Sequence, residues 1–166
     1  REKQRADLRT PGAEHRRLDF LVGDFDATIR YWPSAGEEPL TSSATTANAW
    51  ILGGRFLACE LRGELDGRAW ERRSTLGYDR ARKSYVETRL ESTSTELPAQ
   101  AEGRLGEREN DIVFLRTYDD VVVGERVHLR EVLSIVDWNH HRLELWIDPP
   151  LGEAHRLLEI SYDRIR

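Results

Sequence analysis

The sequence has a single cysteine and no apolar run long enough to span a bilayer. One cysteine, Cys59, excludes an internal disulfide and fits a reducing compartment. No basic segment followed by an apolar stretch opens the sequence, so we expect no signal peptide. The formal net charge of -5 argues against nucleic acid as the main partner. These absences favour a cytoplasmic protein that neither inserts into a membrane nor binds nucleic acid.

Helical signals are confined to a short stretch near the start of the sequence. Residues 1–10 are polar and form a leader, in which Thr10 is a suitable N-cap. Pro11 fits the first helical position, and Gly23 can end a helix in a left-handed conformation. We therefore predict one helix over residues 11–22, packed against an opening of a sheet.

From Asp24 onward the sequence alternates apolar and polar residues with the period of a half-buried strand. Residues 50–57 show the pattern clearly, because Gly53 and Gly54 separate two apolar strand ends and supply the positive φ of a tight turn. Similar turn signals recur along the chain. The predicted strands span residues 24–31, 42–52, 55–65, 70–78, 84–91, 94–104, 112–118, 125–136, 141–148 and 154–165.

The connections between these strands are short, and no helical pattern separates them. Parallel pairing needs long crossovers, so the sheet must be antiparallel. An antiparallel meander of about ten strands hides its edges best as an up-and-down β-barrel, which has room inside for a small ligand. A β-sandwich is the alternative, but its Greek-key crossings usually need longer connections. We therefore predict a single all-β barrel domain over residues 11–166, with a short N-terminal helix.

Charged residues on the apolar face of a strand are the first candidates for a functional site. Glu131 shares a face with Leu129 and Leu133, so an inward apolar face places this carboxylate inside the barrel. A buried carboxylate needs a cation, a hydrogen-bond donor or a raised pKa. We hypothesise that Arg89 points inward and pairs with Glu131 or Glu60; the alternative is that all these charges face solvent.

The phase of the strand over residues 55–65 stays open, because one phase places Glu60 inside the barrel and the other places Cys59 there. Cys59 has no neighbouring cation in the sequence to lower its pKa, so we expect an inert buried thiol. Glu131 and Glu60 are the candidate catalytic residues if the protein is an enzyme.

Aromatic residues on the predicted strands either form the core and barrel wall, which is the commoner role, or contact a ligand. Together with the charged residues they give one set of candidates. The candidate ligand-binding residues are Tyr31, Trp50, Phe56, Glu60, Trp70, Arg89, Glu131 and Trp146.

The five histidines lack the spacing of a metal site. His140 and His141 are adjacent in a predicted turn, so their side chains diverge, and His15, His128 and His155 lie far apart in the sequence. No nucleophile elbow, phosphate loop or zinc motif occurs. We predict no metal and no cofactor.

Several local stretches occur in a characteristic order and spacing. They are Pro11-Gly12-Ala13-Glu14-His15, Leu21-Val22-Gly23-Asp24-Phe25, Trp50-Ile51-Leu52-Gly53-Gly54-Arg55-Phe56-Leu57, Gly77-Tyr78-Asp79 with Lys83-Ser84-Tyr85-Val86, Ser92-Thr93-Ser94-Thr95, and Glu159-Ile160-Ser161-Tyr162. Together they resemble the bacterial domain-of-unknown-function family numbered 1579, over nearly the whole chain from Pro11. Residues 50–57 are the most specific part of the match.

This family is similar to the calycins, the superfamily of lipocalins and fatty-acid-binding proteins. The resemblance implies a calycin-like barrel but no function, because the family has no established activity. Some calycins bind haem through one histidine, which would make His155 the candidate. The sequence departs from the family pattern at Phe25, where a tryptophan is expected, and at Arg89 and Glu91, where an aromatic residue and an aspartate are expected. Different side chains on this strand would change the lining of the pocket, so the identity of the ligand cannot be inferred from a relative.

Three functions fit the sequence. The first is binding of a small, largely apolar or amphipathic molecule inside the barrel, held by one polar anchor. The second is a cofactor-free isomerase or cyclase, of the kind found in secondary metabolism, that uses a perturbed glutamate in the same cavity. The third is an interaction module with a filled barrel. A homodimer is compatible with each of them.

Overall fold

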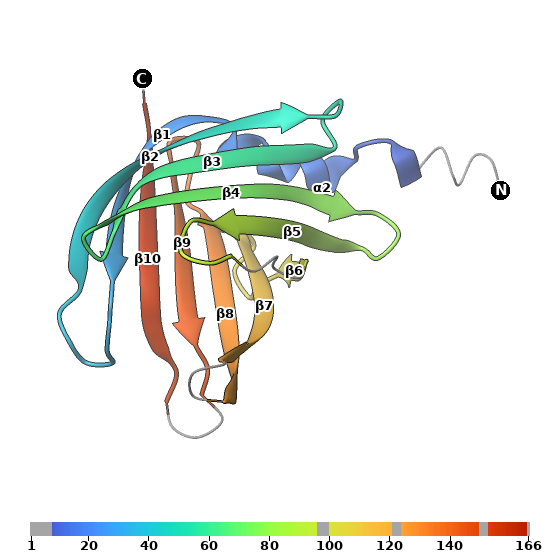
Figure 1. The fold of residues 1–166 in the computed structure, drawn as a ribbon. Helices are drawn as coiled ribbons and strands as arrows, with labels where there is room; N and C mark the ends of the chain where they lie inside the picture. The colour runs from blue at the N-terminus through green and yellow to red at the C-terminus, as the bar shows by residue number, and fades with distance from the viewer. Residues whose placement is uncertain (1–7, 96–99, 121–123, 150–152, 166) are drawn as a thin grey trace.

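The computed structural model describes residues 8–95, 100–120, 124–149 and 153–165, and within them the chain forms a closed barrel of ten antiparallel strands (Figure 1). Each strand pairs with its neighbours in the sequence, and β1 closes the barrel by pairing with β10. The predicted up-and-down barrel with a short N-terminal helix is therefore confirmed. The strands are β1 (Gly23–Tyr31), β2 (Leu40–Ile51), β3 (Phe56–Leu65), β4 (Arg68–Asp79), β5 (Ser84–Glu91), β6 (Ala101–Leu105), β7 (Asp111–Asp120), β8 (Glu125–Ile135), β9 (His140–Ile147) and β10 (His155–Arg164).

The helical segment before β1 has two short parts, α2 (Ala13–Arg16) and a 3-10 helix, η1 (Arg17–Leu21). The prediction of one helix over residues 11–22 is thus right in place, but the second half winds more tightly than an α-helix. The predicted N-cap, Thr10, is wrong, because Gly12 occupies that position. No helix in the described parts of the chain is long and apolar enough to cross a membrane.

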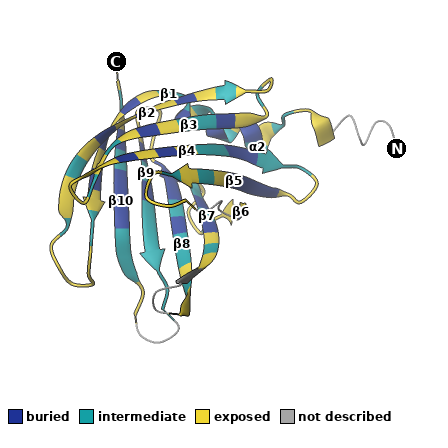
Figure 2. Ribbon diagram, viewed as in Figure 1, coloured by how far each residue is buried: buried dark blue, intermediate teal, exposed yellow. Residues whose placement is uncertain are grey.

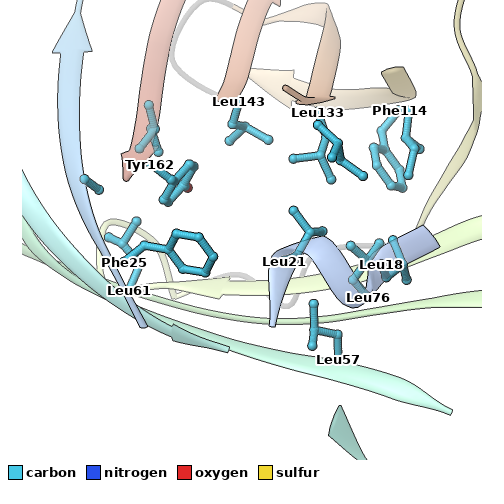
Figure 3. Close-up of a cluster of buried hydrophobic side chains, with 14 of the residues drawn as sticks. Leu18, Leu21, Phe25, Leu57, Leu61, Leu76, Phe114, Leu133, Leu143 and Tyr162 are labelled. Carbon is cyan, nitrogen blue, oxygen red and sulfur yellow. The ribbon is translucent and has the colours of Figure 1, made fainter. Parts of the chain in front are cut away.

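The helical segment covers one end of the barrel. Arg17 donates a hydrogen bond of 2.5 Å to the carbonyl of Glu109 in the β6–β7 turn, and Trp50 on β2 donates one of 2.8 Å from Nε1 to Asp19. Figure 3 shows Leu18 and Leu21 projecting from the segment among the apolar side chains of the strands around it. The segment therefore supplies part of the core as well as the cover.

Side chains alternate between the inside and the outside of the barrel, as the period-two pattern predicts. Figure 2 shows buried and exposed residues alternating along the strands, and β1 and β2 follow this pattern closely. The apolar core fills much of the interior. It includes Leu18, Leu21, Phe25, Ile29, Leu57, Leu61, Trp70, Leu76, Ile112, Phe114, Leu133, Leu143, Ile160 and Tyr162.

The β2–β3 turn confirms the sequence prediction. Leu52, Gly53 and Gly54 have φ values of 51°, 69° and 76°, all in the left-handed region. Glycine adopts this region without steric cost, whereas Leu52 carries the strain of a side chain there. The amide of Arg55 donates to the carbonyl of Ile51 and closes the turn at 3.3 Å.

The strand predicted over residues 94–104 is correct only in its last part. A turn follows β5, closed by a hydrogen bond from the amide of Ser94 to the carbonyl of Glu91, and β6 begins at Ala101. Pro98, on which we based an edge or a bulge, lies outside the described residues. Within the described residues, β6 spans Ala101–Leu105 and pairs with β5 on one side and with β7 on the other.

Candidate functional site

A cluster of ion pairs lies inside the barrel and joins β5, β7 and β8. Arg89 on β5 contacts both oxygens of Glu131 on β8, at 2.8 Å for Nη2–Oε1 and 2.7 Å for Nη1–Oε2. Arg89 Nη2 also donates to both oxygens of Glu87, its neighbour along the same face of β5, at 3.0 Å. Arg116 on β7 contacts Glu87 directly and lies 3.9 Å from Glu131. The predicted inward orientation of Arg89 and its pairing with Glu131 are confirmed.

The cluster spans the part of the sheet where β6 pairs between β5 and β7. Within the described residues, β5 pairs with β6 at only three residue pairs and β6 with β7 at four (Figure 1). Among the described residues, the second half of β5 pairs with β4, and the second half of β7 pairs with β8. The ion pairs from β5 to β7 and β8 add side-chain contacts to the backbone pairing of the closed barrel. These ion pairs therefore contribute to holding the strands together, whatever else the cluster does.

Glu131 is ionised in this setting. Its side chain is 1% exposed, and burial alone would raise its pKa. The positive charges of Arg89 and Arg116 outweigh burial and hold the pKa of Glu131 below its ordinary value. Glu131 is therefore a carboxylate that accepts a charge-assisted hydrogen bond and an ion-pair contact from Arg89. It is not a carboxylic acid that could donate a proton near neutral pH.

A second buried polar group lies on the inner faces of β4, β9 and β10. Arg72 Nη2 donates a hydrogen bond of 2.8 Å to the hydroxyl of Tyr162. The ring of His141 stacks on the ring of Tyr162, with 4.2 Å between their centroids. The rings of His141 and Phe25 form a T-shaped contact, with 4.6 Å between their centroids. Two nitrogen atoms of this group, Nη1 of Arg72 and Nδ1 of His141, are buried without a hydrogen-bond partner among the described residues.

His141 is uncharged in this setting. Burial, together with the positive charges of Arg164 and Arg72, lowers the pKa of His141 to about 3. Burial also raises the pKa of the Tyr162 hydroxyl, against the opposing effect of Arg72. Arg72 is therefore the charged member of this second group.

An internal cavity of about 60 Å³ lies between the two groups. Its lining is mixed: apolar side chains come from the helical segment and several strands, and polar ones come from both groups. The lining residues are Leu21, Thr46, Asn48, Cys59, Leu61, Arg72, Ser74, Leu76, Glu87, Arg89, Phe114, Glu131, Leu133, His141, Leu143 and Tyr162. Figure 3 shows the apolar members of this set, with Leu21 between Leu57 and the side chains of Leu133 and Leu143.

The remaining predicted site residues divide between the two faces of the barrel wall. Trp70 is buried in the core, and Tyr31 and Trp50 are partly buried against it, but none of them lines the cavity. Phe56 and Glu60 lie on the outer face of β3, where Cys59 takes the inward position. Placing Glu60 inside the barrel is thus wrong: its side chain is 48% exposed and lies 3.7 Å from Arg62.

Trp146 also lies on the outer face, beside two arginines. The guanidinium of Arg130 lies 5.4 Å from the ring centroid of Trp146, and that of Arg156 lies 4.9 Å from it. Such cation–π contacts stabilise the wall from outside and place Trp146 away from the cavity.

Sequence reasoning missed Arg72, Arg116, His141 and Tyr162. Arg72 shares the phase of Trp70 and Leu76, so strand phase was the signal that could have found it. His140 and His141 do diverge as predicted, but they begin β9, and His141 points into the core while His140 contacts Asp137 on the surface.

The described residues contain no group of three or more histidine, cysteine, aspartate or glutamate side chains placed to hold a metal ion. His155, the candidate for haem, is half-buried at the start of β10 and does not line the cavity. The absence of a cofactor, like the cytoplasmic location and the domain boundary at residue 11, stays a prediction.

Comparison with solved structures shows the same fold in two proteins of low sequence identity. The structure of Rv2717c from M. tuberculosis has a TM-score of 0.64 and 14% identity, and the match covers 95% of this chain and 100% of that one. The S-type phycobiliprotein lyase CPES from Guillardia theta has a TM-score of 0.62 and 10% identity, covering 94% of this chain and 99% of that one. Identities this low show the fold alone.

No curated protein matches the sequence at a significant level. A protein-family model described as "Protein of unknown function (DUF1579)" matches residues 10–164, which is nearly the whole chain and agrees with the resemblance found in the sequence. The chain therefore belongs to the DUF1579 family.

Proposed function

We propose that the barrel binds a small amphipathic molecule in its interior. The supporting observation is the internal cavity, which has leucine and phenylalanine side chains on some sides and buried arginine, histidine and tyrosine side chains on others. Burying polar side chains costs free energy, and a barrel that served only as a filled scaffold would gain from apolar residues at these positions. A mixed lining of apolar side chains with a few polar ones is the arrangement expected of a small-molecule site.

The size of the cavity limits the ligand. A volume of about 60 Å³ is roughly that of two water molecules in the liquid, whereas sites for drug-sized ligands enclose about 300 Å³ or more. The cavity therefore admits a polar head of a few heavy atoms, and a longer apolar tail requires the surrounding leucines to move. The sequence predicted a largely apolar ligand; the polar lining narrows the proposal to an amphipathic one.

The enzymatic alternative has less support. A general acid or base works best with a pKa near the working pH, and enzymes achieve this by leaving a buried carboxylate without cations. Glu131 has the opposite environment, because Arg89 engages both of its oxygens, and Glu60 lies outside the barrel. The shared fold with a protein named as a phycobiliprotein lyase is compatible with action on another molecule, but 10% identity gives no reason to transfer that activity.

The proposal is tested by the melting temperature in the presence of small probes. The probes are sodium butyrate, sodium hexanoate, butyramide and hexanol, each measured with the wild type and two variants. Ser74→Val places apolar bulk in the cavity, and Thr75→Val changes the next residue, which is outside the cavity lining and loses its hydroxyl contact with Thr88. A ligand that binds only the folded state raises the melting temperature in proportion to the logarithm of its concentration above Kd.

We expect at least one probe to stabilise the wild type and Thr75→Val, and to lose its effect in Ser74→Val. Equal stabilisation of all three proteins would place the binding elsewhere and refute the proposal. No stabilisation by any probe would favour the filled barrel.

A further inference from the structure

We infer that Arg72, Tyr162 and His141 form a binding site for a carboxylate group, so that the ligand of the barrel is a small carboxylic acid in its ionised form. This inference rests on the proposed function and names the chemical class of the ligand.

The first support is the lack of a carboxylate partner for Arg72. Its side chain is nine-tenths buried, and no carboxylate oxygen of the described residues lies within 4.0 Å of it. By contrast, Arg89 and Arg116 contact Glu87 and Glu131 directly. The Arg72 guanidinium keeps a hydrogen bond to Tyr162 and lies 5.4 Å from the ring centroid of Trp70, but no negative charge compensates for the desolvation of its own charge.

The second support is the set of donors beside the unpartnered nitrogen. Nη1 of Arg72 has free N–H groups, and the Tyr162 hydroxyl, which accepts from Nη2, keeps its own proton for another acceptor. A neutral imidazole can donate through one ring nitrogen, and Nδ1 of His141 is buried with no partner. These three groups line the same cavity, and a carboxylate has two oxygens able to accept from such donors.

The third support is the balance of charge inside the barrel. Three arginines lie among two glutamates, while Glu91, which contacts Arg89 at 3.8 Å, has 28% of its side chain exposed at the edge. Of the described charged side chains in the two groups, those at most 14% exposed are three arginines and two glutamates, which leaves one positive charge that a singly charged anion would neutralise. A dianion such as phosphate would overcompensate, and the leucines of the same lining suit the hydrocarbon part of a carboxylic acid.

The test compares an acid with its uncharged isostere. Sodium butyrate and butyramide have nearly the same shape but differ in charge, and each is titrated into 15N-labelled protein at constant ionic strength. The variants are Arg72→Gln and the matched control Arg73→Gln, which changes the next residue, on the outer face of β4. Inorganic phosphate is titrated as a second anion.

We expect butyrate to bind the wild type about 10- to 100-fold more tightly than butyramide, which is the usual effect of hydrogen bonds to a charged group. Arg72→Gln should reduce the preference for butyrate over butyramide to nearly one, whereas Arg73→Gln should leave it unchanged. Phosphate should not displace butyrate from the wild type. If Arg72→Gln does not fold, the ratio of the butyrate and butyramide dissociation constants of the wild type still tests the inference.

Three results would overturn the inference. Equal binding of butyrate and butyramide would show that no carboxylate site exists, and water would then be the natural partner of Arg72, while the proposed binding function would stand. Preserved selectivity in folded Arg72→Gln would place the anion site elsewhere. Failure of both probes, together with failure of the wider probe set, would refute the proposed function itself.

Discussion

Replacing Glu131 by glutamine removes one charge from a fully buried ion pair while it keeps the volume of the side chain. The wild-type carboxylate is 1% exposed and contacts Arg89 at 2.7 and 2.8 Å. After the change, Glu87 is the one buried carboxylate among the described residues that both Arg89 and Arg116 contact. The repulsion between the two arginines is then less fully offset, so the folded state loses stability.

The expected loss follows from what buried pairs cost when one partner is removed. That cost is about 3–5 kcal/mol, and we expect about 3 kcal/mol here because glutamine still accepts a hydrogen bond. For a chain of 166 residues this corresponds to a fall in melting temperature of about 6–12 °C. Glu60→Gln is the matched control, since Glu60 and Arg62 are 48% and 62% exposed, and its effect should stay below about 0.5 kcal/mol.

The assay is equilibrium unfolding in urea at pH 7, applied to Glu131→Gln, Arg89→Gln and the double variant. Because the two side chains contact each other, their effects should be non-additive, with a coupling free energy of about 2 kcal/mol. A coupling below about 0.5 kcal/mol, or a loss for Glu131→Gln no larger than for Glu60→Gln, would refute the account of the cluster.

Lowering the pH gives a second check on Glu131. Its pKa in the folded state lies below the value of 4.5 that the free side chain has, so its stabilising effect is present above pH 4.5 and is lost as the pH falls through the folded-state pKa. The stability difference between the wild type and Glu131→Gln should therefore shrink below pH 4.5. A constant difference down to pH 3 would contradict this.

Three further predictions follow from other buried groups. Because the pKa of His141 falls from 6.5 to about 3 on folding, the unfolded chain binds the extra proton in this range, and stability should drop by about 1.4 kcal/mol per pH unit between pH 6 and pH 4. His141→Phe should remove this slope, and an unchanged slope in urea unfolding would count against a neutral His141. Burial raises the pKa of Cys59 to about 12, so the folded protein should react with a thiol reagent at pH 8 about 1,000-fold more slowly than the unfolded one; comparable rates would contradict burial. A Cβ at Gly103 would lie 2.5 Å from the ring of Phe114, so Gly103→Ala should cost about 1–3 kcal/mol in unfolding free energy, and a neutral effect would show that the ring moves freely.

The sequence predicts the barrel well because its two main signals are local. Alternation with period two identifies strands, and short connections force neighbouring strands to pair antiparallel. The inward position of Glu131 could be predicted for the same reason, since Leu133 on the same face fixes the phase of β8.

Other parts of the site depend on tertiary structure that local patterns do not carry. Both faces of the start of β3 are apolar, so alternation alone could not decide between Cys59 and Glu60. The grouping of Arg72 with Tyr162 joins residues 90 positions apart and depends on the closure of the barrel. The ion pairs from β5 to β7 and β8 likewise join residues far apart in the sequence.

The central claim, that the barrel interior holds a small molecule, is tested most directly by native mass spectrometry of the protein purified from its own host without denaturation. We predict an additional mass that is non-covalent, disappears in the denatured spectrum, and belongs to a compound with a carboxyl group. The same bare protein mass in both spectra would contradict the claim and indicate a barrel whose interior is filled by its own side chains.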